Sequence, residues 1–535
     1  MKRVLSLMLT VCLFLCACLC GCGEDGTGGG FRFPLEAEPK GLDPQTATDT
    51  AAVTVIATLF EGLTAINADG SVVDGAATHT VSEDGKTYTF TLKESYWSTL
   101  KIKGEETGFE QPVMVTAYDF LFGIQRGVDP VTASPLAAEY DPIQNAAAIR
   151  RGEKPLSALG VKAVDERTLV ITLEKADPTF PARLAGTPYM PCQQEFFEST
   201  GGRYGLEKEY ILTNGAFWLA AWNHDESLLM YQNEHYHGDV APEAVRYVIG
   251  VEDPVTSLQN GDLDAAPTET PLGGGITAYP LQDSLRSLYF NTTTDPFTVP
   301  AIRTALRDSV EWQAVHRLLT EQGDTEVLAG GFVPPDGIVG GETYRTDANT
   351  LTAMQSDVAG AKAALQNGLD VLQMNNLPKF ELLAAEDTLS ADIARYLVQS
   401  WQKNLNVYPT LTLLPESELN QRVNSGNYQA AICIRTAAGL SGAENLSCYA
   451  SNAAGNLSRL SNAAVDAAIQ TALCGGRTEL EALEKRLWQE CPAVPISAVT
   501  RYYSVGANVK HVYPRPFGGG RWNAPLYFRD ALKFD

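Results

Sequence analysis

The clearest alternation of apolar and polar positions lies in residues 79–92. Tyr88, Phe90 and Leu92 alternate with threonines, directly after the dipeptide Asp84-Gly85. A period of two is typical of a half-buried strand, and glycine adopts the positive φ of a tight turn at little cost. The segment therefore predicts a β-hairpin with a two-residue turn.

Apolar positions at spacings of three and four predict helices, mainly in the second half of the chain. These segments are 302–319, 359–372, 391–405 and 478–488. In the last of them Thr478 and Glu481 have the spacing of a capping box, and Thr116 is placed to cap an earlier helix. Strand-like segments lie at 168–173, 228–231, 378–383 and 430–434. Strands that alternate with helices predict α/β organisation in the second half.

The longest apolar run is at the start of the chain. Residues 4–19 follow Lys2 and Arg3 and end at Leu19-Cys20-Gly21-Cys22, before a glycine-rich polar segment. A basic start, an apolar core and small residues are typical of a secretory signal. The end of the run resembles a bacterial lipobox, in which the last cysteine is acylated. We expect a lipoprotein signal peptide at 1–21, lipidation of Cys22 and a flexible leash at 22–30, with Cys18 as the alternative lipidated residue.

A transmembrane helix is the other interpretation of this run, which is nearly long enough to span a bilayer. No basic stop-transfer cluster follows it, and no later segment is as apolar. We therefore expect a protein held by one lipid anchor on the outer face of the cytoplasmic membrane, at the cell surface or in a periplasm.

Composition narrows the function classes. The 535 residues are enough for two to four domains, and 44% hydrophobic with 19% charged residues is typical of a folded protein. Net charge is −24, and it becomes −26 when Lys2 and Arg3 leave with the signal. Phosphate backbones repel such a surface, so we expect no nucleic-acid partner.

Five of the ten cysteines lie beyond the signal segment, at positions 192, 433, 448, 474 and 491. An exported protein can form disulfides, and Cys433 with Cys448 is the pair we expect first. Five is an odd number, so at least one thiol stays unpaired. The absence of a C-x-x-C motif after the signal disfavours structural zinc.

Motifs for catalysis and cofactors are weak. His235 and His237 have metal-ligand spacing, but no third ligand is near in the sequence. Gly85-Lys86-Thr87 lacks the earlier glycine of a phosphate-binding loop, and neither G-x-S-x-G nor H-E-x-x-H occurs. We expect no catalytic residue, no metal and no cofactor, which favours a binding protein over an enzyme.

Several motifs occur in an order that is similar to one known family. They include Gly41-Leu42-Asp43-Pro44, Leu59-Phe60-Glu61-Gly62-Leu63, Glu83-Asp84-Gly85-Lys86-Thr87-Tyr88, Asn233-Glu234-His235-Tyr236-His237-Gly238 and Pro492-Ala493-Val494-Pro495. On these residues the chain resembles the family 5 extracellular solute-binding proteins, the oligopeptide- and dipeptide-binding components of ABC importers. The resemblance spans nearly the whole chain after the signal.

This resemblance implies a two-lobed α/β clamshell of the type II periplasmic-binding-protein kind, with an extra subdomain on lobe I. Lobe I would cover 31–270, with the inserted subdomain at about 76–190, and lobe II would cover 271–499. Residues 500–535 would return to lobe I. The implied partners are a peptide or related small solute, an ABC permease and its ATPase subunits on other chains. We expect a monomer.

One segment departs from the family pattern. Peptide binders of the family have a stretch that resembles W-x-x-D, whose aspartate pairs with the peptide amino terminus; the corresponding residues here are Ile432, Cys433, Ile434, Arg435 and Thr436. Arg435 takes the place of the aspartate, or Ala437 or Ala438 does if a small gap is allowed. We expect these five residues to line the ligand site. An inward Arg435 would favour a carboxylate or phosphate on the ligand; the alternative is an Arg435 that faces an acidic neighbour or solvent.

Two other functions remain open at this point. A peptide sensor or chaperone would have the same fold without an importer. An exported hydrolase would need a nucleophile within reach of a base, and the six histidines give no sign of one.

Overall fold

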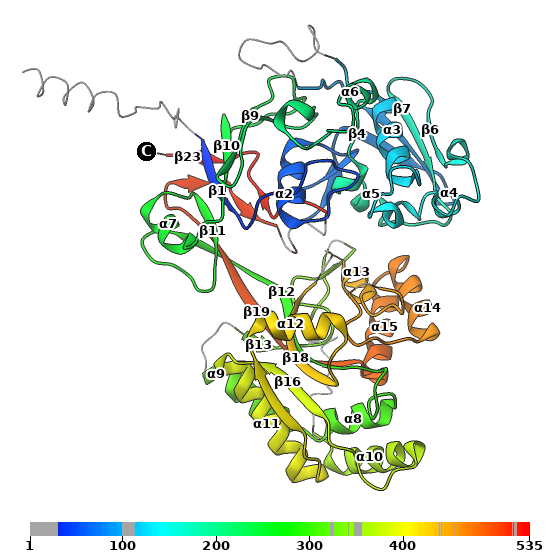
Figure 1. Ribbon diagram of the computed structural model, residues 1–535, viewed down its shortest axis with the longest axis vertical. Helices are drawn as coiled ribbons and strands as arrows, with labels where there is room; N and C mark the ends of the chain where they lie inside the picture. Colours follow the sequence, from blue (N-terminus) through cyan, green and yellow to red (C-terminus); the bar gives the residue numbers. More distant parts are fainter. Residues whose placement is uncertain are drawn as a thin grey trace, which may run out of the picture.

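Two long antiparallel strands, β12 (Thr277–Phe290) and β19 (Ala493–Val505), run from one lobe of the molecule into the other (Figure 1). The structure is a computed structural model. It describes residues 30–98, 113–321, 326–340, 342–346, 356–437, 439, 441–453, 455–515, 517 and 522–534. The expected signal peptide at 1–21, and with it both candidate lipidated residues, Cys18 and Cys22, lie outside these ranges.

Lobe I is built on a four-stranded sheet in the order β1-β10-β9-β8. Its first strand pairs parallel with β10, and the other pairs are antiparallel. The elements of this part are β1 (Phe31–Leu35), α2 (Thr50–Leu59), β2 (Thr64–Ile66), β3 (Val72–Asp74), α6 (Gln194–Ser199), β8 (Phe217–Asn223), β9 (Ser227–Gln232), β10 (Ala244–Ile249), α7 (Pro254–Asn260) and β11 (Ala265–Thr268). Four short strands near the carboxyl end return to this lobe, namely β20 (Val509–Lys510), β21 (Tyr513–Pro514), β22 (Leu526–Tyr527) and β23 (Leu532–Lys533).

A second four-stranded sheet, in the order β4-β5-β7-β6, extends lobe I on the side away from the C-terminus (Figure 1). Its elements are β4 (Ala77–Val81), β5 (Thr87–Leu92), α3 (Ala117–Val128), α4 (Ala146–Arg150), β6 (Val161–Ala163), β7 (Thr168–Thr172) and α5 (Phe180–Arg183). The hairpin predicted from the alternating threonines is confirmed as β4 and β5. Its turn is longer than predicted, because the Ser82 N–H pairs with the Thr87 carbonyl and leaves four residues in the loop.

Lobe II has a seven-stranded sheet that includes β12 and β19. In addition to β11, β12 and β19, this sheet contains β13 (Glu326–Leu328), β16 (Glu381–Ala385), β17 (Thr410–Leu414) and β18 (Ala430–Thr436). A separate two-stranded sheet is formed by β14 (Ile338–Val339) and β15 (Glu342–Thr343). The helices are α8 (Pro300–Asp308), α9 (Trp312–Glu321), α10 (Val358–Leu372), α11 (Thr388–Leu405), α12 (Glu416–Ser425), α13 (Gly442–Ser447), α14 (Ala463–Leu473) and α15 (Arg477–Glu490). The predicted α/β alternation is therefore confirmed.

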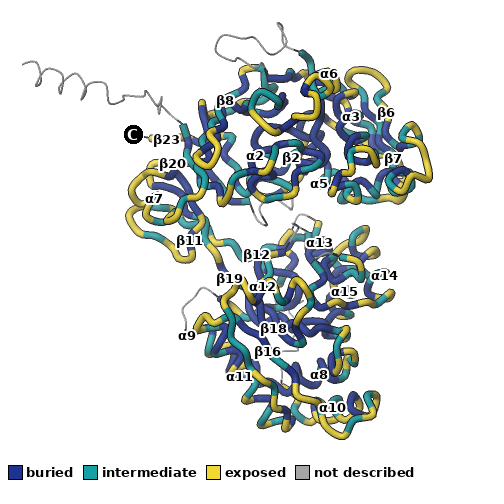
Figure 2. Tube along the Cα trace, in the orientation of Figure 1, coloured by how far each residue is buried: buried dark blue, intermediate teal, exposed yellow. Residues whose placement is uncertain are grey.

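Helices cover both faces of this sheet, so its central strands are apolar on both sides. Ile432 packs into one core, with α8, α9 and α11, while its neighbour Cys433 packs into the other, with α14 and α15. Figure 2 shows β16 and β18 as buried segments within the lower lobe. In the described part of the chain, no helix combines the length and apolar character needed to cross a membrane.

Two of the helix predictions are wrong in detail. The segment 302–319 is broken between α8 and α9, because side chains bind the last carbonyls of α8: the Trp401 indole donates to Leu306 and the Trp312 indole to Arg307. The capping box expected at Thr478 lies two residues earlier, where the Glu479 carboxylate accepts from the Gly476 N–H at 2.8 Å.

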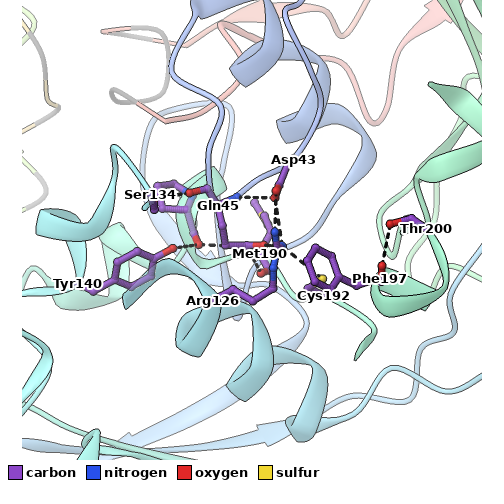
Figure 3. Close-up of polar contacts among 10 residues, drawn as sticks. Asp43, Gln45, Arg126, Ser134, Tyr140, Met190, Cys192, Phe197 and Thr200 are labelled. Atoms are coloured by element: carbon purple, nitrogen blue, oxygen red, sulfur yellow. Dashed lines mark hydrogen bonds and ion pairs between the residues drawn. The ribbon is translucent and has the colours of Figure 1, made fainter. Parts of the chain in front are cut away.

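A buried ion pair ties the start of lobe I to the subdomain (Figure 3). Arg126 of α3 donates to Asp43 at 2.7 Å and to Gln45 at 2.6 Å, and its guanidinium lies 3.9 Å from the centre of the Phe197 ring. Both charged side chains are largely buried, at 7% and 14% exposure. Three segments distant in the sequence therefore meet at one arginine.

We predict that Arg126→Met lowers the free energy of unfolding by about 3 kcal/mol, because it leaves Asp43 as a buried charge without its partner. Urea unfolding followed by circular dichroism measures this change. The control is Arg151→Met, which removes an exposed ion pair with Glu153 and should leave the unfolding midpoint unchanged. Equal midpoints for the two variants would contradict the assigned role of Arg126.

Candidate functional site

The crossing between the lobes carries an irregularity in both strands. The register of β12 on β19 shifts between Leu281 and Ser284. At this place Arg501 of β19 donates to Asp283 of β12 at 2.7 Å, and the Gln282 side chain donates to Thr500 at 2.9 Å. A short irregular stretch between two regular ladders is where relative motion of the lobes is most easily absorbed.

A cavity of about 820 Å³ lies beside this crossing. Lobe I contributes wall residues from β1, α2 and β10, and the crossing strands and the end of β18 contribute others. The larger apolar and aromatic members of the wall include Phe33, Leu35, Tyr247, Leu281, Tyr502 and Phe517. Its volume falls within the usual range for small-molecule sites, which are concave and mostly apolar with a few polar groups.

Local sequence explains how lobe I presents its part of the wall. Alternate residues of β1 are buried in the pattern that places Phe33 and Leu35 on one face. Asp49 caps α2 by accepting from the Ala52 N–H at 2.9 Å, which fixes the first turn of this helix against the cavity. Thr50 and Thr54 of that helix are members of the wall.

The five residues expected at the ligand site lie in different environments, because successive side chains of β18 point to opposite faces of the sheet. Ile432 and Cys433 are buried in the two cores of lobe II and have no side-chain surface for a ligand. Ile434 is 36% exposed and is not a member of the cavity wall. Thr436, at the end of the strand, lines the cavity.

Arg435 lies on the same face of β18 as Cys433 and does not line the cavity. Its guanidinium donates to the Cys448 sulfur, and no carboxylate oxygen of the described residues lies within 4.0 Å of it. The acidic neighbour considered for Arg435 is therefore not found in that part of the chain. With the gapped placement, Ala437 packs in a small apolar cluster with Ile66, Ala185 and Phe517, which brings the lobes into contact; Ala438 lies outside the described residues.

The expected Cys433–Cys448 disulfide is not formed, and both cysteines are free. Cys433 and Cys448 both pack into the second core of lobe II, where the Cys448 sulfur accepts a hydrogen bond from the Arg435 guanidinium. Burial raises the pKa of both thiols, that of Cys433 to about 12. A buried, protonated thiol behaves as a small apolar side chain.

A cluster of polar side chains lies in lobe I, beside a smaller cavity of about 120 Å³. The Glu61 carboxylate accepts from His237 at 2.5 Å, from Tyr236, and from Arg529 at 3.4 Å. Burial alone would raise the pKa of Glu61, but the hydrogen bond and charge of His237, followed by Arg529 and Tyr236, lower it.

This cluster also explains the two histidines considered as metal ligands. His237 binds Glu61, whereas the His235 ring packs edge-on against Tyr96. The imidazoles therefore have separate partners. The segment 233–238 and the motif that contains Glu61 were both part of the family pattern, but neither predicts that Glu61 and His237, 176 residues apart, form a hydrogen bond.

Comparison with known proteins gives one family. The model for "Bacterial extracellular solute-binding proteins, family 5 Middle" matches residues 71–456. The oligopeptide-binding protein OppA of Bacillus subtilis strain 168 is 30% identical over 448 residues, covering 80% of this chain and 78% of the relative. The probable deoxycholate-binding periplasmic protein YgiS of Escherichia coli K12 is 31% identical over 401 residues, covering 71% and 70%.

Solved structures are similar over almost the full length. The structure of the Escherichia coli murein tripeptide binding protein MppA has a TM-score of 0.68 and 27% identity, and the match covers 95% of this chain and 99% of that one. The type II clamshell expected from the sequence is thereby confirmed.

We predict that Glu61→Gln destabilises the protein at neutral pH and that this effect fades in acid. The lowered pKa of Glu61 means that its stabilisation is fully present above its ordinary value of 4.5 and is lost as pH falls through the lower folded value. Urea unfolding of the wild-type and Glu61→Gln proteins, from neutral pH to below the folded-state pKa of Glu61, measures the difference in their free energies of unfolding. Glu83→Gln, in an exposed loop, is the control; a difference independent of pH would contradict the ionic role of Glu61.

Proposed function

Because the chain belongs to the bacterial extracellular solute-binding proteins of family 5, we propose that it captures short peptides in the 820 Å³ cavity and delivers them to the permease of an ABC importer. The observation that carries this proposal is the position of the cavity, whose wall comes from lobe I and from the strands that lead into lobe II. A ligand there contacts both lobes at once. Two of the relatives are named for oligopeptide and murein tripeptide binding.

Capture in this fold depends on closure. A ligand that contacts both lobes stabilises the state in which the lobes approach, because that state alone offers both sets of contacts. The contact of Ala437 with Ile66 and Phe517 is a place where the lobes already touch. The closed complex is the form that docks on the permease, which is formed by other chains, as are the ATPase subunits.

Binding without chemical conversion is the activity proposed for this chain. Members of the family are solute-binding proteins, and the described residues of the cavity wall include no serine, cysteine or histidine. We take lobe I as residues 31–270 and 500–535, and lobe II as 271–499. The protein acts as a monomer, since one chain supplies both walls of the cavity.

A second candidate ligand is an amphipathic solute. The wall is largely apolar, and the relative YgiS is named for deoxycholate. Such a solute would use the same cavity and the same closure. Peptides remain the first candidate, because more of the relatives are named for them.

We predict that trileucine raises the melting temperature of the protein and is recovered intact after incubation. A ligand that binds the native state stabilises it by about 2.7 kcal/mol at a hundred times its Kd. Thr436→Trp fills the cavity and should abolish the shift, while Val371→Trp, on the outer face of α10, should retain it. A melting temperature that trileucine does not change, or an equal rise in melting temperature in Thr436→Trp, would contradict peptide capture in this cavity.

We further propose that Cys22 carries a lipid that holds the protein on the outer face of the membrane, through the leash at 22–30. In a bacterial host the Cys22→Ala variant should lose lipid label and appear in the soluble fraction after export. Cys18→Ala is the matched control and should stay lipidated and membrane-bound. The opposite pattern would move the anchor to Cys18, and membrane retention of both variants without label would point to a transmembrane helix.

A further inference from the structure

An arginine that has no carboxylate partner among the described residues lies in the wall of both cavities. Arg515 follows β21 and is a member of both walls. Its guanidinium donates to the Ile66 carbonyl at 2.7 Å and to the Ala524 carbonyl at 3.2 Å. Within the described ranges, no carboxylate oxygen lies within 4.0 Å of it, and its buried Nε has no acceptor.

A second cation lies near Arg515, whose guanidinium also lies 5.5 Å from the centre of the Tyr527 ring. Arg529, the next cation, is near enough to lower the pKa of Arg515, which burial and this neighbour together bring to about 10. Glu61 is the carboxylate that lines the smaller cavity together with Arg515, and it already binds His237 and Arg529. Arg515 therefore stays charged at neutral pH, while the Glu61 carboxylate is paired with His237 and Arg529.

The remaining charges of the large cavity do not balance Arg515. Arg501, the other arginine of that wall, is paired with Asp283 at 2.7 Å. Glu36 and Glu269 also belong to the wall, but both are exposed and neither forms an ion pair with Arg515. A largely buried cation without a counter-charge is costly unless an anion joins it.

We propose that Arg515 binds a carboxylate of the ligand from the lobe I side of the cavity. Its planar guanidinium suits a carboxylate, and Phe33, Leu281 and Phe517 provide an apolar surface for the rest of the molecule. The site then selects solutes with an apolar body and a carboxylate. This inference rests on the proposed function in taking the cavity as the ligand site. A peptide carboxyl terminus and a fatty acid offer the same chemistry.

Calorimetry with two pairs of probes tests Arg515. The first pair is trileucine and trileucine amide, and the second is octanoate and octanol. We expect at least one acid to bind wild-type protein about 10-fold or more tightly than its neutral analogue, as hydrogen bonds to charged groups provide. Arg515→Gln should remove this preference. Arg459→Gln, at a surface position of lobe II whose arginine donates to the Asn424 carbonyl, should keep it.

Arg515→Lys provides a second variant that keeps the charge, and it should retain part of the preference. The inference is overturned if neither acid binds, if acids and neutral analogues bind equally in both pairs, or if the preference survives in Arg515→Gln. Octanoate bound through Arg515 without any trileucine binding would support the inference and reject peptide capture. Equal binding of trileucine and its amide, without an acid preference in the second pair, would reject the inference and leave peptide capture intact.

Discussion

The pairing of β12 with β19 is the constraint on which the rest of the structure depends. The two strands pair from Thr277 opposite Val505 to Tyr289 opposite Ala493, with two register shifts, and their pairing continues from lobe I into the core of lobe II. Neither lobe can move without bending this ladder. Of its two register shifts, the one between Leu281 and Ser284 lies beside the cavity, and the other follows between Arg286 and Ser287. A ligand in the cavity therefore contacts the segment of the crossing strands that connects the two lobes.

The charges near the crossing have different roles because they are solvated and paired differently. Arg501 is 49% exposed and bound to a buried aspartate, which links the strands. Arg435 is not a member of the cavity wall, and it lies on the same face of β18 as Cys433 and donates to the Cys448 sulfur. Arg515 faces both cavities without a carboxylate partner among the described residues. The ligand segment expected on β18 therefore contributes Thr436, while the proposed ionic contact comes from lobe I.

Local features were predictable from the sequence, and features formed by distant residues were not. The β4–β5 hairpin and the start of α3 depend on neighbours in the chain, and both are found, with the Thr116 N–H bound by Asp119 at 2.7 Å. The break between α8 and α9 depends on Trp401, about 95 residues from the carbonyl it binds. No local pattern announces such a contact.

The same distinction applies to the site. The order of motifs identified the family and its clamshell, since each motif is short and contiguous. Cys433 and Cys448 pack in the same core of lobe II and are both free, and the spacing in the sequence alone does not give this arrangement. Arg515 had no motif to mark it, because its environment comes from Ile66, 449 residues away, and from Ala524 and Arg529.

A crystal structure of the trileucine complex is the decisive measurement for capture between the lobes. We expect trileucine density inside the cavity beside the strand crossing, in contact with Thr436 on one side and with lobe I residues such as Tyr247 on the other. Density confined to the outer surface of one lobe, with the cavity still empty, would contradict it.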